Sequence, residues 1–168
     1  MFPRTKSRNM PAQILLLRHA EKPDSASDLG LSAKGQIRAA ALAVYLPAVF
    51  GRPSHLVATQ RSKDSDRPRL TLQPLSDALR IPIDTRFQDD QYKDLAHELL
   101  TDPRYQDARI ALCWHHGEIP DLARALQAPD APDHWDPDAF DRIWQIDYGL
   151  DHPKLTKVHQ KLLYGDSD

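Results

Sequence analysis

Short apolar runs alternate with longer amphipathic segments along most of this chain. The apolar runs, which predict strands, are residues 13–17, 55–59, 81–87 and 109–114. The amphipathic segments, which predict helices, are residues 31–49, 68–79, 92–100 and 119–128. Because strands and helices take turns, we expect a three-layer α/β/α sandwich with a mostly parallel central sheet.

The remaining segments are less regular. Residues 128–141 are rich in Pro and Asp and predict a loop, whereas residues 142–148 predict an edge strand. Residues 155–163 form a terminal element whose type the pattern leaves open. In the first predicted helix, Ser32 is a suitable N-cap, and apolar residues such as Ile37 and Val44 recur at helical spacing.

A length of 168 residues fits one domain, which we place at residues 12–168. Residues 1–11 hold three basic side chains but no apolar core of signal-peptide type, so we expect a disordered tail there. The sequence leaves open whether Met1 or Met10 is the physiological start. The chain has a single cysteine and no apolar run near the roughly 18 residues of a membrane span, which favours a soluble cytoplasmic protein.

The overall charge gives no sign of a polyanionic partner. The formal net charge is -2 and the isoelectric point about 6.4, so the chain lacks the global basic field of nucleic-acid-binding proteins. We therefore expect neither nucleic acid nor a membrane as partner, and any recognition of an anion must be local.

Histidines follow two of the predicted strands. Arg18-His19 comes directly after residues 13–17, and His115-His116-Gly117-Glu118 comes directly after residues 109–114. The carboxyl ends of parallel strands lie at one edge of a sheet, so imidazoles and an arginine from distant segments can line one pocket. This combination suits a phosphate group.

Phosphoryl transfer needs an in-line nucleophile and positive charge around the equatorial oxygens. A neutral imidazole can attack phosphorus, and with a reference pKa of about 6.5 it is available near neutral pH, so His19 is the candidate nucleophile. We expect Arg18, Arg67 and His116 to complete the anion pocket, with Arg61 and Arg69 as rivals of Arg67. For His115 we expect a structural role or a place just outside the residues that touch the phosphate.

A metal site is a poor alternative. Adjacent histidines on a strand point to opposite faces, so His115 and His116 are badly placed to chelate one ion, and no His-Glu-x-x-His helix occurs. We expect no metal.

Four motifs together resemble the histidine phosphatase superfamily, also called the phosphoglycerate mutase-like family. They are Arg18-His19-Ala20-Glu21, Leu31-Ser32-Ala33-Lys34-Gly35, the Arg-x-x-x-Thr segment from Arg67 to Thr71, and Trp114-His115-His116-Gly117. The resemblance implies a phosphate pocket made of Arg18, His19, Arg67 and His116, a phosphohistidine on His19, and no cofactor. The chain departs from the family in a longer approach from Thr59 to Arg67 and in lacking the Glu-rich motif that often supplies the acid.

The leaving oxygen still needs a proton. Asp89 and Asp90 occupy the loop where the family often has its acid, and Glu118 lies two residues beyond His116, so we favour Asp89 or Asp90 over Glu118. We thus expect a phosphatase acting on a phosphorylated small molecule or phosphoprotein. The alternatives are a catalytically weak phosphate- or phosphopeptide-binding module and, behind it, a phosphomutase. The sequence does not disclose the substrate or the oligomeric state.

Overall fold

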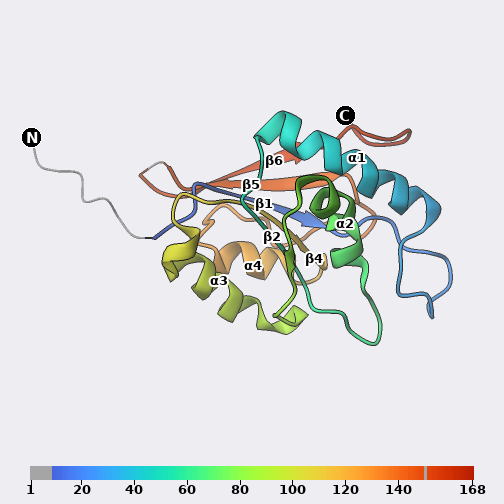
Figure 1. Cartoon of the computed structure of the whole chain (residues 1–168), viewed down its shortest axis with the longest axis horizontal. Helices are drawn as coiled ribbons and strands as arrows, with labels where there is room; N and C mark the ends of the chain where they lie inside the picture. Colours follow the sequence, from blue (N-terminus) through green and yellow to red (C-terminus); the bar gives the residue numbers. More distant parts are fainter. Residues whose placement is uncertain (1–8, 150) are drawn as a thin grey trace, which may run out of the picture.

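A six-stranded mixed sheet runs through the middle of the molecule in this computed structural model, which describes residues 9–149 and 151–168 (Figure 1). The strands are β1 (Gln13–Arg18), β2 (His55–Ala58), β3 (Ile83–Asp84), β4 (Arg109–Trp114), β5 (Arg142–Asp147) and β6 (Lys154–His159). Their order across the sheet is β3-β2-β4-β1-β5-β6. The first four strands are mutually parallel, and β5 runs antiparallel to both β1 and β6.

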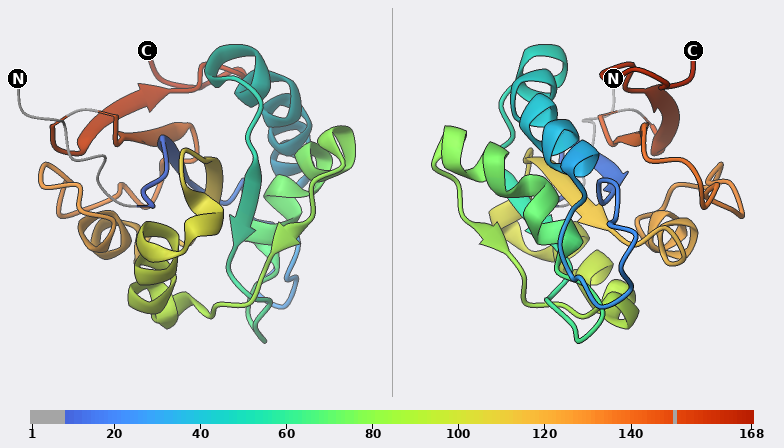
Figure 2. Two further views of the ribbon diagram at one scale, coloured as in Figure 1. Left: turned by 60° about the vertical axis from the view of Figure 1, so that its left-hand side comes forward. Right: turned by 90° about the vertical axis from the view of Figure 1, so that its right-hand side faces the viewer.

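Two helices cover each face of the sheet (Figure 2). The helices are α1 (Ala33–Phe50), α2 (Arg67–Leu79), α3 (Tyr92–Thr101) and α4 (Ile119–Ala125), with 3-10 turns at Asp89–Gln91 and Pro103–Tyr105. Helices α1 and α2 pack on one face and α3 and α4 on the other. The expected three-layer α/β/α architecture is confirmed.

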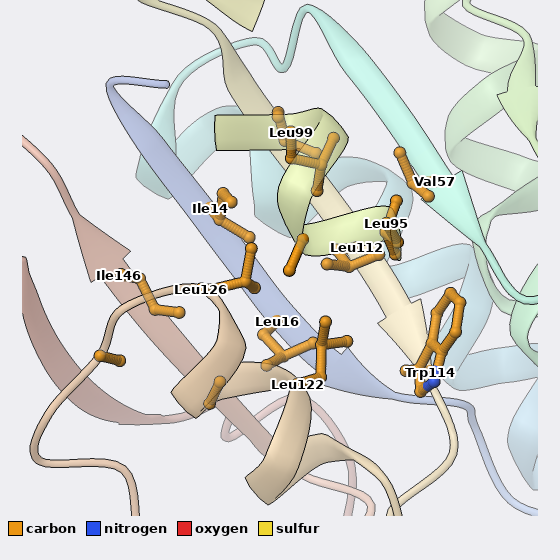
Figure 3. Packing of buried hydrophobic residues seen from close by; sticks show 14 of the residues in the cluster. Ile14, Leu16, Val57, Leu95, Leu99, Leu112, Trp114, Leu122, Leu126 and Ile146 are labelled. Carbon is orange, nitrogen blue, oxygen red and sulfur yellow. The ribbon is translucent and has the colours of Figure 1, made fainter. Parts of the chain in front are cut away.

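The central strands are apolar along their whole length because both of their faces are covered. In β1, Ile14 and Leu16 join the cluster under α3 and α4, whereas Leu15 and Leu17 join the cluster under α1 and α2. Figure 3 shows the first cluster, in which Leu95 and Leu99 of α3 and Leu122 of α4 lie against the sheet. This core holds the ends of β1 and β4 side by side.

Several expected elements differ from the observed ones. Residues 142–148 were predicted to be an edge strand, but β5 lies between β1 and β6, so β6 is the edge on that side. Of the element left open at residues 155–163, residues 155–159 belong to strand β6, and residues 160–163 are not in a strand. The strand expected at residues 81–87 pairs over only two residues, and α4 ends three residues before the predicted position.

The core-facing side of α1 also differs from the apolar pattern. Ile37 is 59% exposed and Val44 is 72% exposed, whereas Leu42 and Leu46 are buried and so is the charged Arg38. The spacing of apolar residues predicted that the side of α1 with Ile37 and Val44 faces the core. In the structure, a different side of the helix packs on the sheet.

The beginning of the chain is only partly covered by the structure. The expected tail falls mostly on residues 1–8, which lie outside the described residues. Met10, which we had placed in that tail, packs against the core, and its carbonyl oxygen accepts a hydrogen bond of 2.9 Å from the Asp107 backbone. Within residues 9–149 and 151–168, no helix has the length and apolar character to cross a membrane.

Candidate active site

Four loops meet at the carboxyl edge of the parallel strands and enclose a cavity of about 700 Å³. The loops follow β1, β2, β3 and β4, which are neighbours in the sheet, so residues far apart in sequence share one pocket. The predicted site residues that line it are Arg18, His19, Arg67, Asp89, Asp90 and His116. His115 lines it too, whereas Glu118 does not.

His19 is held in one tautomer by its own loop. The ring is only 3% exposed, and Nδ1 lies 2.7 Å from the Ala20 carbonyl oxygen. A carbonyl oxygen can only accept, so Nδ1 carries the hydrogen and Nε2 keeps its lone pair. Burial lowers the pKa of His19 to about 3, so the ring is neutral at physiological pH. A neutral imidazole of this kind is a competent nucleophile.

Thr71 fixes the loop that carries His19. The hydroxyl of this fully buried residue accepts a hydrogen bond of 2.8 Å from the Ala20 backbone and donates one of 2.8 Å to the Arg67 carbonyl. It therefore links the loop after β1 to the start of α2. This contact explains the threonine of the Arg-x-x-x-Thr motif.

Replacing Thr71 by valine should misplace His19 with little change in side-chain volume. T71V removes the acceptor for the buried Ala20 N–H, and a shift of about 1 Å in a reacting group can cost roughly 100-fold. We therefore expect any turnover that uses His19 to slow about 10- to 100-fold, measured beside the melting temperature. T71S retains the hydroxyl and should preserve most of the activity. Equal kcat in T71V and the native protein would show that other contacts hold the loop.

Gly35 allows α1 to approach the same loop closely. A Cβ atom at this position would lie 2.4 Å from the Glu21 carbonyl oxygen, which is too close for any side chain. The Glu21 oxygen also accepts a hydrogen bond of 2.9 Å from the Ser32 backbone, at the N-cap of α1. The Leu-Ser-x-x-Gly motif thus allows the first turn of α1 to pack directly on the loop that follows His19.

Arg38 connects this loop to the C-terminal segment. Its buried guanidinium forms an ion pair with Glu21 and a second one, of 2.6 Å, with Asp166. It also donates to Gln160 over 2.9 Å. Asp166 in turn accepts hydrogen bonds from the Leu162 and Leu163 backbones. Arg38 can therefore be buried on α1, because the carboxylates of Glu21 and Asp166 neutralise its charge.

Arg18 is oriented by the loop between α4 and β5. Its Nη1 donates to the Pro137 carbonyl over 2.5 Å and to the Ala139 carbonyl over 3.3 Å, and its guanidinium lies 3.8 Å from the centre of the Phe140 ring. Burial lowers the pKa of Arg18 to about 10, which leaves the group cationic at neutral pH. Sequence reasoning did not identify Phe140, whose ring also lies 6.0 Å from that of His19.

Arg67 is fixed in the same way by backbone carbonyls. Its Nε donates to Gly30 over 2.9 Å and its Nη2 donates to Asp28 over 2.7 Å. Nη1 has no hydrogen-bond partner within the described part of the chain. Arg67 lines the cavity, whereas its rival Arg69 is paired with Asp66 at 2.5 Å and does not. Two pre-oriented guanidinium groups therefore stand on the cavity that His19 faces.

The imidazole that packs against His19 belongs to His115, while His116, the residue expected in the pocket, also lines the cavity. The ring centres of His19 and His115 lie 5.3 Å apart, edge to face, and burial lowers the pKa of His115 to about 4. His116 lines the same cavity, and burial lowers its pKa as well. Strand register explains the result, because Arg18 pairs with Trp114 and the next residues are therefore neighbours.

Asp89 is the carboxyl group best placed to supply a proton. It lines the cavity, and its Oδ1 is buried without a hydrogen-bond partner among the described residues. Burial, reinforced by the charges of Glu118 and Asp90, raises the pKa of Asp89 to about 7. Asp90 is exposed, and the Glu118 carboxyl lies outside the cavity. A half-protonated acid at neutral pH suits proton donation.

Metal ligands are not assembled in the described residues. No group of three or more His, Cys, Asp or Glu side chains in residues 9–149 and 151–168 has the geometry to hold an ion. The side chains that line the cavity include imidazoles, guanidinium groups and carboxyl groups. Such a set can bind a phosphate and act on its phosphoryl group.

Comparison with solved structures shows that this fold is that of the histidine phosphatase superfamily, as the four motifs predicted. The chain is similar to the mycobacterial glucosyl-3-phosphoglycerate phosphatase solved with inorganic phosphate, at 16% identity and a TM-score of 0.59 over 88% of this chain and 95% of that chain. It is similar to the protein histidine phosphatase SixA solved with tungstate, at 15% identity and a TM-score of 0.59 over 88% and 97%.

A third similar structure is the phosphoserine phosphatase from Entamoeba histolytica solved with 3-phosphoglyceric acid, at 16% identity and a TM-score of 0.55 over 92% of this chain and 100% of that chain. No protein-family model matches the sequence, and no curated protein does. The shared fold covers nearly the whole of each similar structure.

Proposed function

We propose that the chain is a phosphatase that hydrolyses phosphate monoesters through a phosphohistidine on His19. The observation that carries this proposal is the His19 ring itself, which is neutral and held with Nε2 available on a cavity that Arg18 and Arg67 also line. The similar structures are named as phosphatases, which supports the same class of reaction.

In the first step the Nε2 lone pair attacks phosphorus, and the bond between phosphorus and the ester oxygen breaks. Arg18 and Arg67 hold the equatorial oxygens, and His115 completes the pocket beside the attacking ring. Asp89 donates its proton to the departing oxygen, so the alcohol leaves neutral. The products of this step are the alcohol and a phosphoramidate on His19.

In the second step a water molecule attacks phosphorus, and the bond between phosphorus and Nε2 breaks. Asp89, now ionised, takes the proton from the water and returns to its starting state. The net reaction converts a phosphate ester and water into an alcohol and inorganic phosphate. The open cavity of about 700 Å³ admits water, which favours hydrolysis over transfer to a second alcohol.

Trapping the covalent intermediate tests this proposal. Turnover stopped in alkali, where phosphohistidine survives, should yield a phosphorylated peptide that contains His19 by mass spectrometry. H97A is the matched control, since His97 is exposed on α3 and away from the cavity, and it should give the same peptide. Turnover without any phosphopeptide would instead assign the attack to water. Phosphate binding without turnover would favour the binding module.

A further inference from the structure

Two cations on the cavity have no role in the chemistry proposed above. Lys22 follows the loop of His19, and Arg61 lies in the loop between β2 and α2. Both line the cavity, and both are exposed. Within residues 9–149 and 151–168 neither side chain has an ion pair or a hydrogen bond. They are therefore free to bind an anion that enters from solvent.

Five of the other exposed or half-buried arginines in the described residues pair with a carboxylate, whereas Arg52, Arg80 and Arg109 do not. The exposed or half-buried arginines that pair with a carboxylate are Arg69, Arg86, Arg104, Arg124 and Arg142. Asp64 lies three residues further along the same loop and lines the same cavity, but it forms no ion pair with Arg61. The loop thus holds this cation at the cavity without neutralising it.

The backbone on both sides of Arg61 is fixed. The Gln60 N–H donates to the Phe87 carbonyl over 2.7 Å, which ties this loop to the one that carries Asp89. The Ser62 N–H donates to the Ser65 carbonyl over 2.9 Å, and the Ser62 hydroxyl accepts from the Ser65 N–H over 3.1 Å. Arg61 therefore has a defined position at the cavity although its side chain is in solvent. This segment is also where the chain is longer than the family it resembles.

We propose that Arg61, together with Lys22, binds a second anionic group on the alcohol part of the substrate. The inference rests on the proposed phosphatase function, because Arg18 and Arg67 are already committed to the phosphate. The substrate class is then a small phosphate monoester that also carries a carboxylate or a second phosphate. Asp64 and Asp90 line the same cavity, so the cavity as a whole is not strongly positive. Preference for an anionic substrate therefore depends on the local positions of Arg61 and Lys22.

A pair of isosteric substrates tests the proposal. 4-Carboxyphenyl phosphate carries a second negative charge, and 4-carbamoylphenyl phosphate is its neutral isostere. The native protein should prefer the carboxylate, and R61A should reduce this preference, expressed as the ratio of the two kcat/KM values, about tenfold, or about 1.4 kcal/mol, because the variant lacks the charge-assisted hydrogen bonds of the guanidinium. An aryl bisphosphate, in which a second phosphate replaces the carboxylate, then shows which of the two anionic groups the protein prefers.

Lys63 provides the matched control, because it lies in the same loop but does not line the cavity. K63A should retain the native preference, and raising the salt concentration should weaken that preference in the native protein. Equal losses on both substrates in R61A, or the same loss of preference in K63A, would overturn the assignment of Arg61. Absence of turnover on both substrates in the native protein would instead count against the phosphatase function itself.

Discussion

H19A should lower kcat for a phosphate monoester at least about 10³- to 10⁴-fold. The substitution removes the Nε2 lone pair, and the remaining arginines can only stabilise a direct attack by water. Steady-state hydrolysis of 4-nitrophenyl phosphate, followed as released nitrophenol, measures the loss. The loss should appear in kcat because the phosphate pocket of Arg18 and Arg67 is still present, and phosphate should still inhibit or bind the variant.

Variants of the other histidines separate the nucleophile from its surroundings. H97A should retain native kcat, while H115A should reduce kcat more than H116A, since the His115 ring is the one beside His19. Comparable activity in H19A and the native protein would remove His19 from the mechanism. A larger effect in H116A than in H115A would restore the assignment made from the His-Gly motif.

D89N should lower kcat about 10²- to 10³-fold for an alkyl phosphate and far less for 4-nitrophenyl phosphate. An alkoxide needs a proton to leave, whereas nitrophenolate leaves without one, so only the first substrate depends on the acid. D90N tests the rival acid and should have the smaller effect, because Asp90 is exposed and burial raises the pKa of Asp89 instead. Equal losses in D89N for both substrates would indicate that Asp89 positions the substrate.

The pH profile of the native protein follows from the same two groups. The pKa of Asp89 is raised to about 7, so the acid form needed for alkyl phosphates is lost as pH rises through about 7. The pKa of His19 is lowered to about 3, so the nucleophile is lost only as pH falls through about 3. When transfer of the phosphoryl group to His19 limits the rate, we therefore expect kcat for an alkyl phosphate to be flat between these values and to fall tenfold per unit above about 7. In D89N the upper limb should disappear.

The melting temperature of D89N shows whether a loss of activity in this variant comes from the missing acid or from a less stable fold. Because the folded-state pKa of Asp89 lies above its ordinary value of 3.8, its contribution to stability is fully present below pH 3.8 and lost as pH rises through about 7. At pH 8 the native protein carries a buried charge that asparagine lacks. The melting temperature of D89N at pH 8 should thus equal or exceed that of the native protein.

The sequence predicted the order of the elements because the central strands are unambiguous. The bounds of β4 were predicted correctly, and those of β1 to within one residue, since a strand covered on both faces is apolar throughout. The exposed strand β6 mixes Lys154 and Lys157 with apolar residues, so its pattern did not distinguish a strand from a helix. Without β6, β5 was predicted to be the edge strand. The buried side of α1 was missed because Arg38 sits on it, and only the positions of Glu21 and Asp166 explain that burial.

The residues of the candidate site were also largely predictable, because each follows a predicted strand or begins a helix. What the sequence could not supply was orientation. The choice between His115 and His116 depends on the register of β1 against β4, and the choice of Asp89 depends on how deeply each carboxyl group is buried. Phe140 had no signal at all, since it lies in a loop whose path over Arg18 is set by tertiary packing.

The central position of β1 has a consequence for how the protein is made. β1 leaves the ribosome before the other five strands of the sheet, but both of its neighbours, β4 and β5, lie beyond residue 108. Its Ile14–Leu17 stretch therefore stays unpaired while most of the chain is synthesised, and unpaired apolar strands promote aggregation. The pocket around His19 can form only after β4 and the histidines that follow it have been synthesised. We expect yield from rapid expression to depend on chaperones that cover this segment in the nascent chain.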